Sequence, residues 1–220
     1  MRSIHKSFVL LAMAVAMAVP VHAFAQNAYV FKGNLLKNKD NEHKAKLGKG
    51  LYIISMESKQ FDTFLFLDNP QGQEVANDDD GGNGLNSLIK YNVEKPGVYT
   101  IVASAFNDND SGMYIIKVSK AIQNIKGKFN GNSVPHKIKM KKGNTYVFDM
   151  TSKDFDTFLT LKDSNGTTVG TDDDGGQGLN SLLRYTAPND GEYTIYAGSF
   201  GNQGQGDYNL ITTESAPTKK

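Results

Sequence analysis

One long tandem duplication limits the possible folds of this chain more than any other feature. The twelve residues 78–89 return as residues 172–183, each time as three aspartates followed by a glycine-rich turn. Residues 61–65 and 155–159 repeat at the same separation of 94 positions. Solenoid and propeller repeats have periods of about 20–50 residues, whereas a period near 94 is the size of a small complete domain. The sequence therefore predicts two tandem copies of one domain, each with its own core.

The first 25 residues lie outside the duplication and have the pattern of a secretory signal peptide. Arg2 and Lys6 give a positive start, residues 8–19 are apolar, and residues 23–25 offer a small-x-small cleavage site. The apolar run is shorter than the roughly 20 residues that a membrane-spanning helix needs. We expect a signal peptide at residues 1–25, a first domain at 26–119, a second at 120–214 and a disordered tail at 215–220.

Composition excludes several classes of function. The chain has no cysteine, so disulfides, thiolate metal sites, thiol nucleophiles and a lipid-modified cysteine are all excluded. Removal of residues 1–25 takes away two basic residues and no acid, so the formal net charge goes from +1 to −1. This balance gives no indication of nucleic-acid binding. No second apolar stretch offers a membrane anchor, and we expect a secreted or periplasmic protein.

The sequence of each copy indicates short strands separated by turns that are rich in Gly, Asn and Asp. Residues 51–56 and 145–150 are rich in β-branched and aromatic side chains. Alternation in residues 61–67 predicts that Leu65 and Leu67 point into the core while Asp62 points away from it. No segment has a sustained helical period. The sequence thus predicts an all-β protein with two tandem jelly-roll-like β-sandwich domains.

The ordered motifs of the first copy are LYIIS, FDTFL, DNPQG, NDDDGGNGLNSLI, GVYTI and SGMYIIKV. Together with their repeats they resemble the bacterial pre-peptidase C-terminal (PPC) domain family over residues 28–118 and 122–212. The resemblance implies a small β-sandwich that serves as a non-catalytic accessory module, usually behind a secreted peptidase. Relatives of that family include calcium-dependent collagen-binding modules. This chain departs from the pattern because no peptidase accompanies the two copies.

The acidic cluster is the best candidate for chemistry. Adjacent carboxylates repel by about 1 kcal/mol in water and about 4 kcal/mol at an effective dielectric constant near 20, so they favour a bound cation. Ca²⁺ takes six to eight oxygen ligands, and we expect Asp78 and Asp80 to converge while Asp79 faces elsewhere. The candidate ligands are Asp62, Asp78, Asp79, Asp80, Asn86 and Ser87 in the first copy, and Asp156, Asp172, Asp173, Asp174, Asn180 and Ser181 in the second.

Two alternatives need no metal. The phrase can be an exposed turn whose side chains cap local backbone amides, with Leu85 and Leu88 anchoring it in the core. The carboxylates can also pair with the downstream cations Lys90 and Arg184. The spacing differs from that of an EF-hand loop, so the sequence leaves the choice between calcium and a structural turn open.

Catalysis is disfavoured. Outside the signal peptide the histidines are His43 and His136, which do not align at the 94-residue offset, and we expect both to be solvated. No catalytic triad order, zinc motif or phosphate loop is present.

Alternation in residues 137–141 and 44–47 predicts strands with outward lysines, which either protect a sheet edge or bind an acidic polymer. Aromatic residues 64, 66, 106 and 196 can stack on a ligand or lie between the copies.

These observations favour a secreted, non-catalytic binding or adhesion module. We expect it to be stabilised by Ca²⁺ and to recognise an extracellular protein or polysaccharide, without nucleic acid and without a membrane anchor. The alternative is a structural or regulatory partner that binds an envelope or secreted enzyme non-covalently. The polymer or protein partner has no marker in the sequence.

Overall fold

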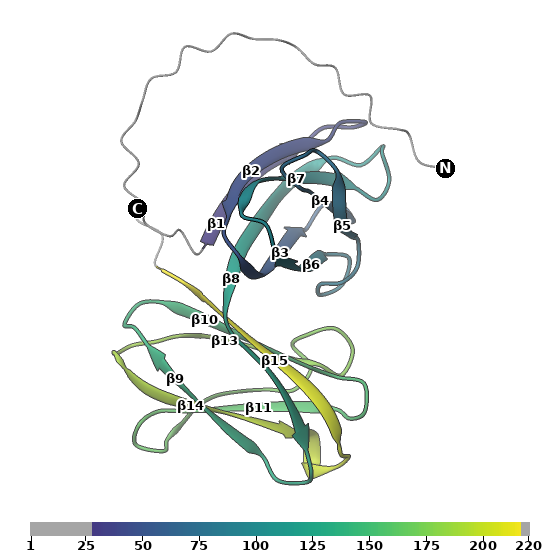
Figure 1. Ribbon diagram of the computed structural model, residues 1–220. Coiled ribbons are helices and arrows are strands. Elements are labelled where there is room, and N and C mark those ends of the chain that lie inside the picture. The colour runs from purple at the N-terminus through teal and green to yellow at the C-terminus, as the bar shows by residue number, and fades with distance from the viewer. Residues whose placement is uncertain (1–27, 217–220) are drawn as a thin grey trace, which may run out of the picture.

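A computed structural model describes residues 28–216, and it consists of two β-sandwiches that follow one another along the chain (Figure 1). The predicted all-β class and the tandem jelly-roll-like sandwiches are confirmed. The helical element of the described residues is the short 3₁₀ turn η1, Phe200–Asn202. The predicted signal peptide and residues 217–220 of the predicted tail lie outside the described residues.

The first copy has two four-stranded layers. One layer has the order β1-β8-β3-β6, and the other has the order β2-β7-β4-β5, with antiparallel pairing throughout. The strands are β1 Ala28–Leu35, β2 Asn41–Leu47, β3 Gly50–Ser58, β4 Thr63–Asp68, β5 Glu74–Asp78, β6 Ser87–Val93, β7 Gly97–Ala105 and β8 Gly112–Phe129.

The second copy repeats both layers. Its orders are β8-β15-β10-β13 and β9-β14-β11-β12. The remaining strands are β9 Val134–Met140, β10 Thr145–Ser152, β11 Thr157–Lys162, β12 Thr168–Asp172, β13 Ser181–Thr186, β14 Gly191–Ser199 and β15 Gly206–Ser215. Each strand therefore occupies the position that its duplicate occupies in the other sandwich.

Strand β8 joins the two copies without a linker. Its first half pairs with β1 and β3, and its second half pairs with β15, so one seven-stranded sheet runs through both sandwiches. A register shift lies opposite Thr212 and Thr213, where the strand passes from one core to the other. Core-facing residues are even-numbered before this shift, as Ile116 and Val118, and odd-numbered after it, as Phe129. An irregularity of this kind bends a strand, and here it lies where β8 passes from the first copy to the second.

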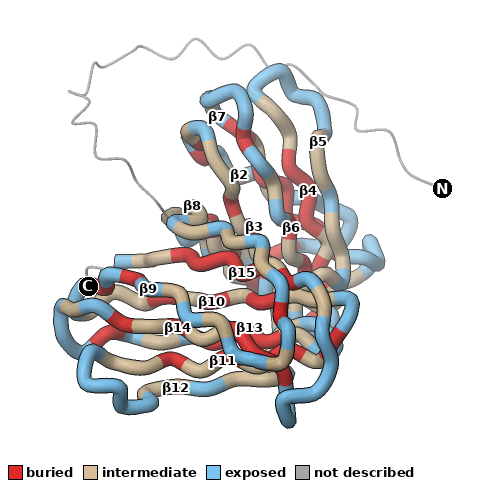
Figure 2. The backbone as a smooth tube through the Cα atoms, turned by 60° about the horizontal axis from the view of Figure 1, so that its bottom comes forward, coloured by how far each residue is buried: buried red, intermediate tan, exposed pale blue. Residues whose placement is uncertain are grey.

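Each sandwich has its own core, and buried positions alternate with less buried ones along many of its strands (Figure 2). Leu65 and Leu67 are fully buried in the first copy, as the alternation predicts, and Leu159 and Leu161 are their counterparts in the second. Complete burial of such a side chain contributes about 1.5–3 kcal/mol. Since the two clusters share no residue, each copy is stabilised by its own apolar side chains.

A glycine and a tyrosine face each other on neighbouring strands in both copies. Gly33 pairs with Tyr114, and a Cβ atom on Gly33 would lie 2.2 Å from the tyrosine oxygen. Gly127 has the same relation to Tyr208, at 2.3 Å. The glycine leaves room for the aromatic ring to lie across the neighbouring strand, which explains why a glycine recurs 94 positions after Gly33.

The two histidines are equivalent, and the prediction that they do not align and are solvated was wrong. His43 Nε2 lies 2.8 Å from the Tyr114 hydroxyl, and His136 Nε2 lies 2.8 Å from that of Tyr208. His43 lies opposite Ile101 on the neighbouring strand, and His136 lies opposite Ile195, which is the residue equivalent to Ile101. The turn before β2 is longer than the turn before β9, and the turn after β2 is shorter than the turn after β9. Equivalent residues of β2 and β9 are therefore not 94 positions apart, although those of the other strands are. Burial lowers the pKa of both histidines.

The lysine-rich strands lie at sheet edges. Lys137 and Lys139 of β9 are exposed, Ile138 and Met140 between them are buried, and β9 is the last strand of its layer. β2 has the same edge position in the first copy. This arrangement confirms the predicted outward lysines and fits protection of an edge from further strand pairing.

Candidate functional site: two acidic tips and an intervening cleft

Asp78 and Asp172 hold the acidic loops by bonding backbone amides. The N–H groups of Gly81 and Leu88 both donate to Asp78 Oδ2 at 2.7 Å. In the second copy, Gly175 and Leu182 donate to Asp172 Oδ1 at 3.1 and 2.7 Å. A Cβ atom at position 81 would lie 2.5 Å from the carboxylate, so glycine must follow the three aspartates. Asp79 Oδ1 also accepts from the Asp80 N–H at 2.8 Å, and Asp173 Oδ1 from the Asp174 N–H at 2.9 Å. This geometry is the backbone cap that the turn alternative predicts, at two aspartates of the three.

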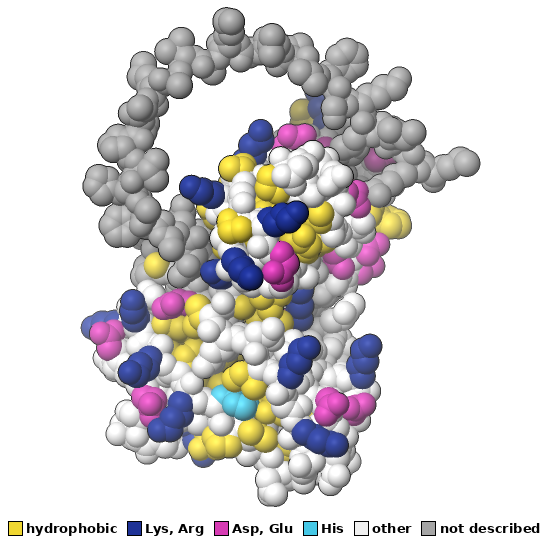
Figure 3. Space-filling model, viewed as in Figure 1, with side chains coloured by type: hydrophobic (Ala, Val, Ile, Leu, Met, Phe, Trp, Pro, Cys, Tyr) yellow, Lys and Arg dark blue, Asp and Glu magenta, His cyan; other side chains and the backbone are white. Residues whose placement is uncertain are grey.

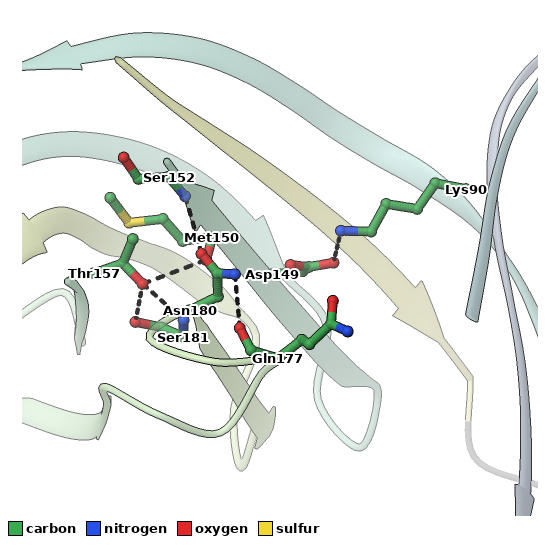
Figure 4. Close-up of polar contacts among 8 residues, drawn as sticks. All are labelled: Lys90, Asp149, Met150, Ser152, Thr157, Gln177, Asn180 and Ser181. Atoms are coloured by element: carbon green, nitrogen blue, oxygen red, sulfur yellow. Dashed lines mark hydrogen bonds and ion pairs between the residues drawn. The ribbon is translucent and has the colours of Figure 1, made fainter. Parts of the chain in front are cut away.

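Asn86 and Ser87 also bond within the protein. The Ser58 N–H donates to Asn86 Oδ1 at 3.0 Å, and Asn86 Nδ2 donates to the Asn83 carbonyl at 2.7 Å. Ser87 is fully buried, and its hydroxyl lies 2.7 Å from Thr63 Oγ1. The second copy repeats this arrangement with Asn180, Ser181 and Thr157 (Figure 4). These side chains fasten the loop to the sandwich, and their oxygens are already bonded.

Asp62 lies within the electrostatic reach of the acidic loop. Asp62 lies near Asp79 and Asp80 at the start of β4, and its Oδ1 atom is buried without a hydrogen-bond partner. Burial raises the pKa of the Asp62 carboxyl, and the charges of Asp80, Asp79 and Asp110 raise it further. Asp78 turns toward the loop backbone, and Asp79 Oδ1 accepts a hydrogen bond from the Asp80 N–H. The convergence of Asp78 and Asp80 on a cation stays a prediction.

The second copy has the same group. Asp156 Oδ1 is likewise buried without a partner. Burial raises the pKa of the Asp156 carboxyl first, and the charges of Asp174 and Asp173 add to that shift. Within residues 28–216, no three His, Asp or Glu side chains are already grouped as a metal site. Calcium therefore stays a prediction, now with a smaller carboxylate set in each copy.

In each copy, two large apolar side chains flank the carboxylate whose Oδ1 atom has no hydrogen-bond partner. This carboxylate is Asp62 in the first copy and Asp156 in the second. The Thr63 N–H donates to the Leu85 carbonyl at 3.1 Å, and the Phe106 N–H donates to the Asp62 carbonyl at 3.0 Å. Leu85 is 58% exposed and Phe106 is 61% exposed, so the prediction that Leu85 anchors the turn in the core was wrong. We call Asp62, Asp79, Asp80, Leu85 and Phe106 tip one.

Tip two consists of the counterparts Asp156, Asp173, Asp174, Leu179 and Phe200. Leu179 is 59% exposed and Phe200 is 54% exposed. The backbone bonds recur, with the Thr157 N–H on the Leu179 carbonyl at 3.0 Å and the Phe200 N–H on the Asp156 carbonyl at 3.0 Å. Figure 3 shows acidic and apolar side chains side by side at the edge of the upper sandwich. The sequence does not predict that these leucines are exposed in both copies, because a leucine in a turn is equally compatible with a buried position that anchors the turn in the core.

A cleft of about 1270 Å³ lies between the sandwiches. Its walls are the outward faces of the two halves of the seven-stranded sheet, and they include Ile53 and Leu88 from the first copy and Val147 and Leu182 from the second. Ile211 is only 3% exposed although it lines this cleft, so the walls approach closely there. Serine, threonine and asparagine side chains also line the cleft. The charged side chains of its lining are the cations Lys117, Lys141 and Arg184 and the acids Glu57, Asp149 and Glu214.

Two contacts join the copies across this cleft. Lys90 Nζ lies 2.7 Å from Asp149 Oδ2, and the Asp149 side chain is 13% exposed (Figure 4). Gln177 Nε2 donates to the Asp80 carbonyl at 3.0 Å and brings the two acidic loops together. The predicted pairing of Lys90 with its own acidic cluster was wrong, because Lys90 binds the other copy. Within residues 28–216, Arg184 forms no ion pair.

Comparison with known families agrees with this arrangement. The family model of the bacterial pre-peptidase C-terminal domain matches residues 46–105 and 136–199, which together are more than half of the chain. The chain belongs to the PPC domain family, and it contains two tandem copies, as the resemblance predicts. The PPC domain is a non-catalytic accessory domain found in secreted bacterial peptidases, and no catalytic domain is matched here. No relative was found among curated proteins.

Comparison with solved structures gives matches of low similarity. Aeromonas hydrophila PliG, a periplasmic lysozyme inhibitor of g-type lysozyme, is 16% identical, covers 42% of this chain and 85% of its own, and has a TM-score of 0.36. The PBSX exported protein XepA is 9% identical over 90% of each chain, with a TM-score of 0.34. Tripeptidyl peptidase 2 is 10% identical over 88% of this chain and 23% of its own, with a TM-score of 0.31. None of these likenesses carries a functional inference.

Proposed function

We propose that this protein is an exported, non-catalytic binding module that holds an extracellular protein or polysaccharide in the cleft between its two copies. The cleft of about 1270 Å³ is the observation that carries this proposal, because it is large enough for part of a polymer chain. The PPC family membership supports an accessory role outside the cytoplasm. The helix search over residues 28–216 finds no segment long and apolar enough to span a bilayer.

The lining suits a ligand with both apolar and hydrogen-bonding groups. Leu88, Val147 and Leu182 supply apolar surface, while Ser55 and Thr213 supply hydroxyls. Arg184 brings five N–H donors and no carboxylate partner of its own within the described residues. Such a mixture of apolar walls and a few convergent polar groups is typical of binding sites.

A direct binding screen tests this function. The full chain is tested against extracellular matrix proteins and polysaccharides, and the strongest ligand is then titrated against two matched variants. Leu182→Arg places a long cation in the cleft, whereas Thr171→Arg places the same side chain on exposed β12. We expect only the cleft variant to lose binding. Equal binding by both variants would place the ligand elsewhere on the protein.

We also propose that Ca²⁺ stabilises the module at the two tips. The support is the buried Oδ1 atom of Asp62, which no donor satisfies, beside the carboxylates of Asp79 and Asp80. Asp156, Asp173 and Asp174 form the same group in the second copy. Hard cations prefer such oxygens, and extracellular calcium sites have dissociation constants of roughly 10⁻⁴–10⁻³ M. When bound, the ion would neutralise the clustered charge.

Calorimetry in millimolar Ca²⁺, Mg²⁺ or EDTA tests the calcium proposal. We expect Ca²⁺ to raise the melting temperature of the wild type and not that of Asp62→Asn with Asp156→Asn. The control is Asp78→Asn with Asp172→Asn, because these carboxylates cap the backbone. That control should melt lower in every buffer and keep its Ca²⁺ response. A wild type indifferent to Ca²⁺ ends the proposal.

The regulatory alternative predicts a different result in the binding screen. A module that binds and controls an envelope enzyme needs no affinity for matrix polymers. It would instead change the activity or stability of one secreted enzyme, and co-purification of that enzyme with the full chain would favour this alternative.

A further inference from the structure

We propose that the two tips form one docking surface for a basic protein segment that carries apolar side chains between its lysines or arginines. None of the residues of tip one or tip two lines the cleft, so the proposal goes beyond the function proposed above. It rests on three features of the tips: repeated exposed apolar side chains, carboxylates without cationic partners, and direct contact between the two loops.

The apolar part is present at equivalent positions in both copies. Leu85 and Phe106 flank Asp62, and Leu179 and Phe200 flank the counterpart carboxylate, with more than half of each of the four side chains exposed. The centre of the Phe106 ring lies 6.3 Å from that of Phe64, and the centre of the Phe200 ring lies 6.2 Å from that of Phe158. Single exposed apolar residues are ordinary, but paired ones at the same place in both copies indicate a contact surface.

Without bound Ca²⁺, the charge at tip one is acidic, and no cationic side chain of residues 28–216 neutralises it. Asp108 and Asp110 follow Phe106 directly in the sequence, and the charge of Asp110 acts on Asp62. In residues 28–216, no ion pair involves Asp62, Asp79, Asp80, Asp108 or Asp110. Lysines pair elsewhere, for example Lys117 with Glu57 on the sheet face. An acidic rim around apolar protrusions is complementary to a partner with the opposite charge.

The tips adjoin and are unequal. The Gln177 side chain bonds the Asp80 carbonyl, so one extended partner can reach both loops. The positions that carry Asp108 and Asp110 in the first copy carry Asn202 and Gly204 in the second. Tip one therefore carries the stronger field, and a basic segment should bind mainly there, with tip two supplying apolar contact.

Fluorescence anisotropy with the full chain in EDTA tests the proposal. The probe is a labelled peptide in which lysines alternate with leucines, and the control peptides replace lysine by glutamate or leucine by serine. We expect saturable binding of the first peptide alone, weakened by salt, since the screening length falls from about 10 Å at 0.1 M to 3 Å at 1 M. Leu85→Ser with Phe106→Ser should weaken binding at least about tenfold.

Matched variants separate the tip from general surface effects. Asp108→Asn with Asp110→Asn should weaken binding and reduce its salt dependence, while Val98→Ser, which is 50% exposed at the other end of β7, should not matter. No binding by the wild type, equal binding of the glutamate peptide, or an equal loss in Val98→Ser overturns the proposal. Sedimentation with anionic lipid vesicles in place of peptide binding would make the tips a membrane surface and would also overturn it.

Discussion

The two amide bonds of Asp78 allow the cost of its removal to be worked out. Asp78 accepts from the Gly81 and Leu88 N–H groups with a single carboxylate oxygen, at 2.7 Å in both cases. Hydrogen bonds to charged groups contribute about 1.5–3 kcal/mol each, and the half-exposed loop lets water replace part of the loss. We therefore expect Asp78→Ala to lower the free energy of unfolding by about 2–3 kcal/mol.

Asp78→Asn should cost much less. Because both N–H groups donate to the same oxygen, an asparagine carbonyl can keep both bonds, and only the contribution of the charge is lost, about 1 kcal/mol. Asp80→Ala is the matched comparison, since the Asp80 side chain accepts no hydrogen bond within the loop and is exposed. It should change stability by less than about 0.5 kcal/mol.

Urea unfolding followed by far-UV circular dichroism measures these differences, because the chain has no tryptophan for fluorescence. The experiment is run in EDTA so that cations do not contribute. The expected order of stability is wild type and Asp80→Ala, then Asp78→Asn, then Asp78→Ala. If Asp80→Ala lost as much as Asp78→Ala, or if Asp78→Ala lost less than about 0.5 kcal/mol, the capping argument would be refuted.

Three further predictions follow from the same contacts. Gly33→Ala should cost about 1–3 kcal/mol in urea unfolding, because its Cβ meets the buried Tyr114 ring, whereas Gly191→Ala should cost less than half as much. In EDTA, the raised pKa of Asp62 should make the wild type gain stability relative to Asp62→Asn as the pH falls from 7 toward 4, since the folded state binds the proton more tightly; a parallel pH profile would contradict this. A double-mutant cycle on Lys90 and Asp149 should give a coupling of about 1 kcal/mol, and the exposed pair of Lys137 and Glu192 should give a smaller one.

Most of the fold could be predicted because its signals are local or repeated. Alternation over residues 61–67 assigns Leu65 and Leu67 to the core, and the duplication makes the same assignment independently for the second copy. The lysine alternation of β9 likewise follows from the period of two. Such patterns depend on neighbouring residues only, so they survive without knowledge of the tertiary arrangement.

The site was predicted less completely because its contacts depend on tertiary geometry. The sequence correctly joins Asp62 to the acidic phrase, but it cannot tell which aspartate turns to the backbone, since three adjacent aspartates offer the same chemistry. The contact between Lys90 and Asp149 depends on how the two copies lie relative to each other, which no local sequence pattern shows. The equivalence of His43 and His136 is hidden by two turns whose lengths differ in opposite senses.

The duplication also separates what the fold requires from what each copy does alone. The amide caps of Asp78 and Asp172, the buried Thr–Ser pairs and the Gly–Tyr pairs recur in both sandwiches, and each has a structural reason to be there. The features that differ serve contacts beyond a single sandwich. Asp149 stands where the first copy has Ser55 and binds the other copy, and Asp108 stands where the second copy has Asn202. If the caps belong to the fold and the unmatched acids belong to function, then the search for a partner should begin at tip one, where Asp108 and Asp110 have no acidic counterparts in the second copy.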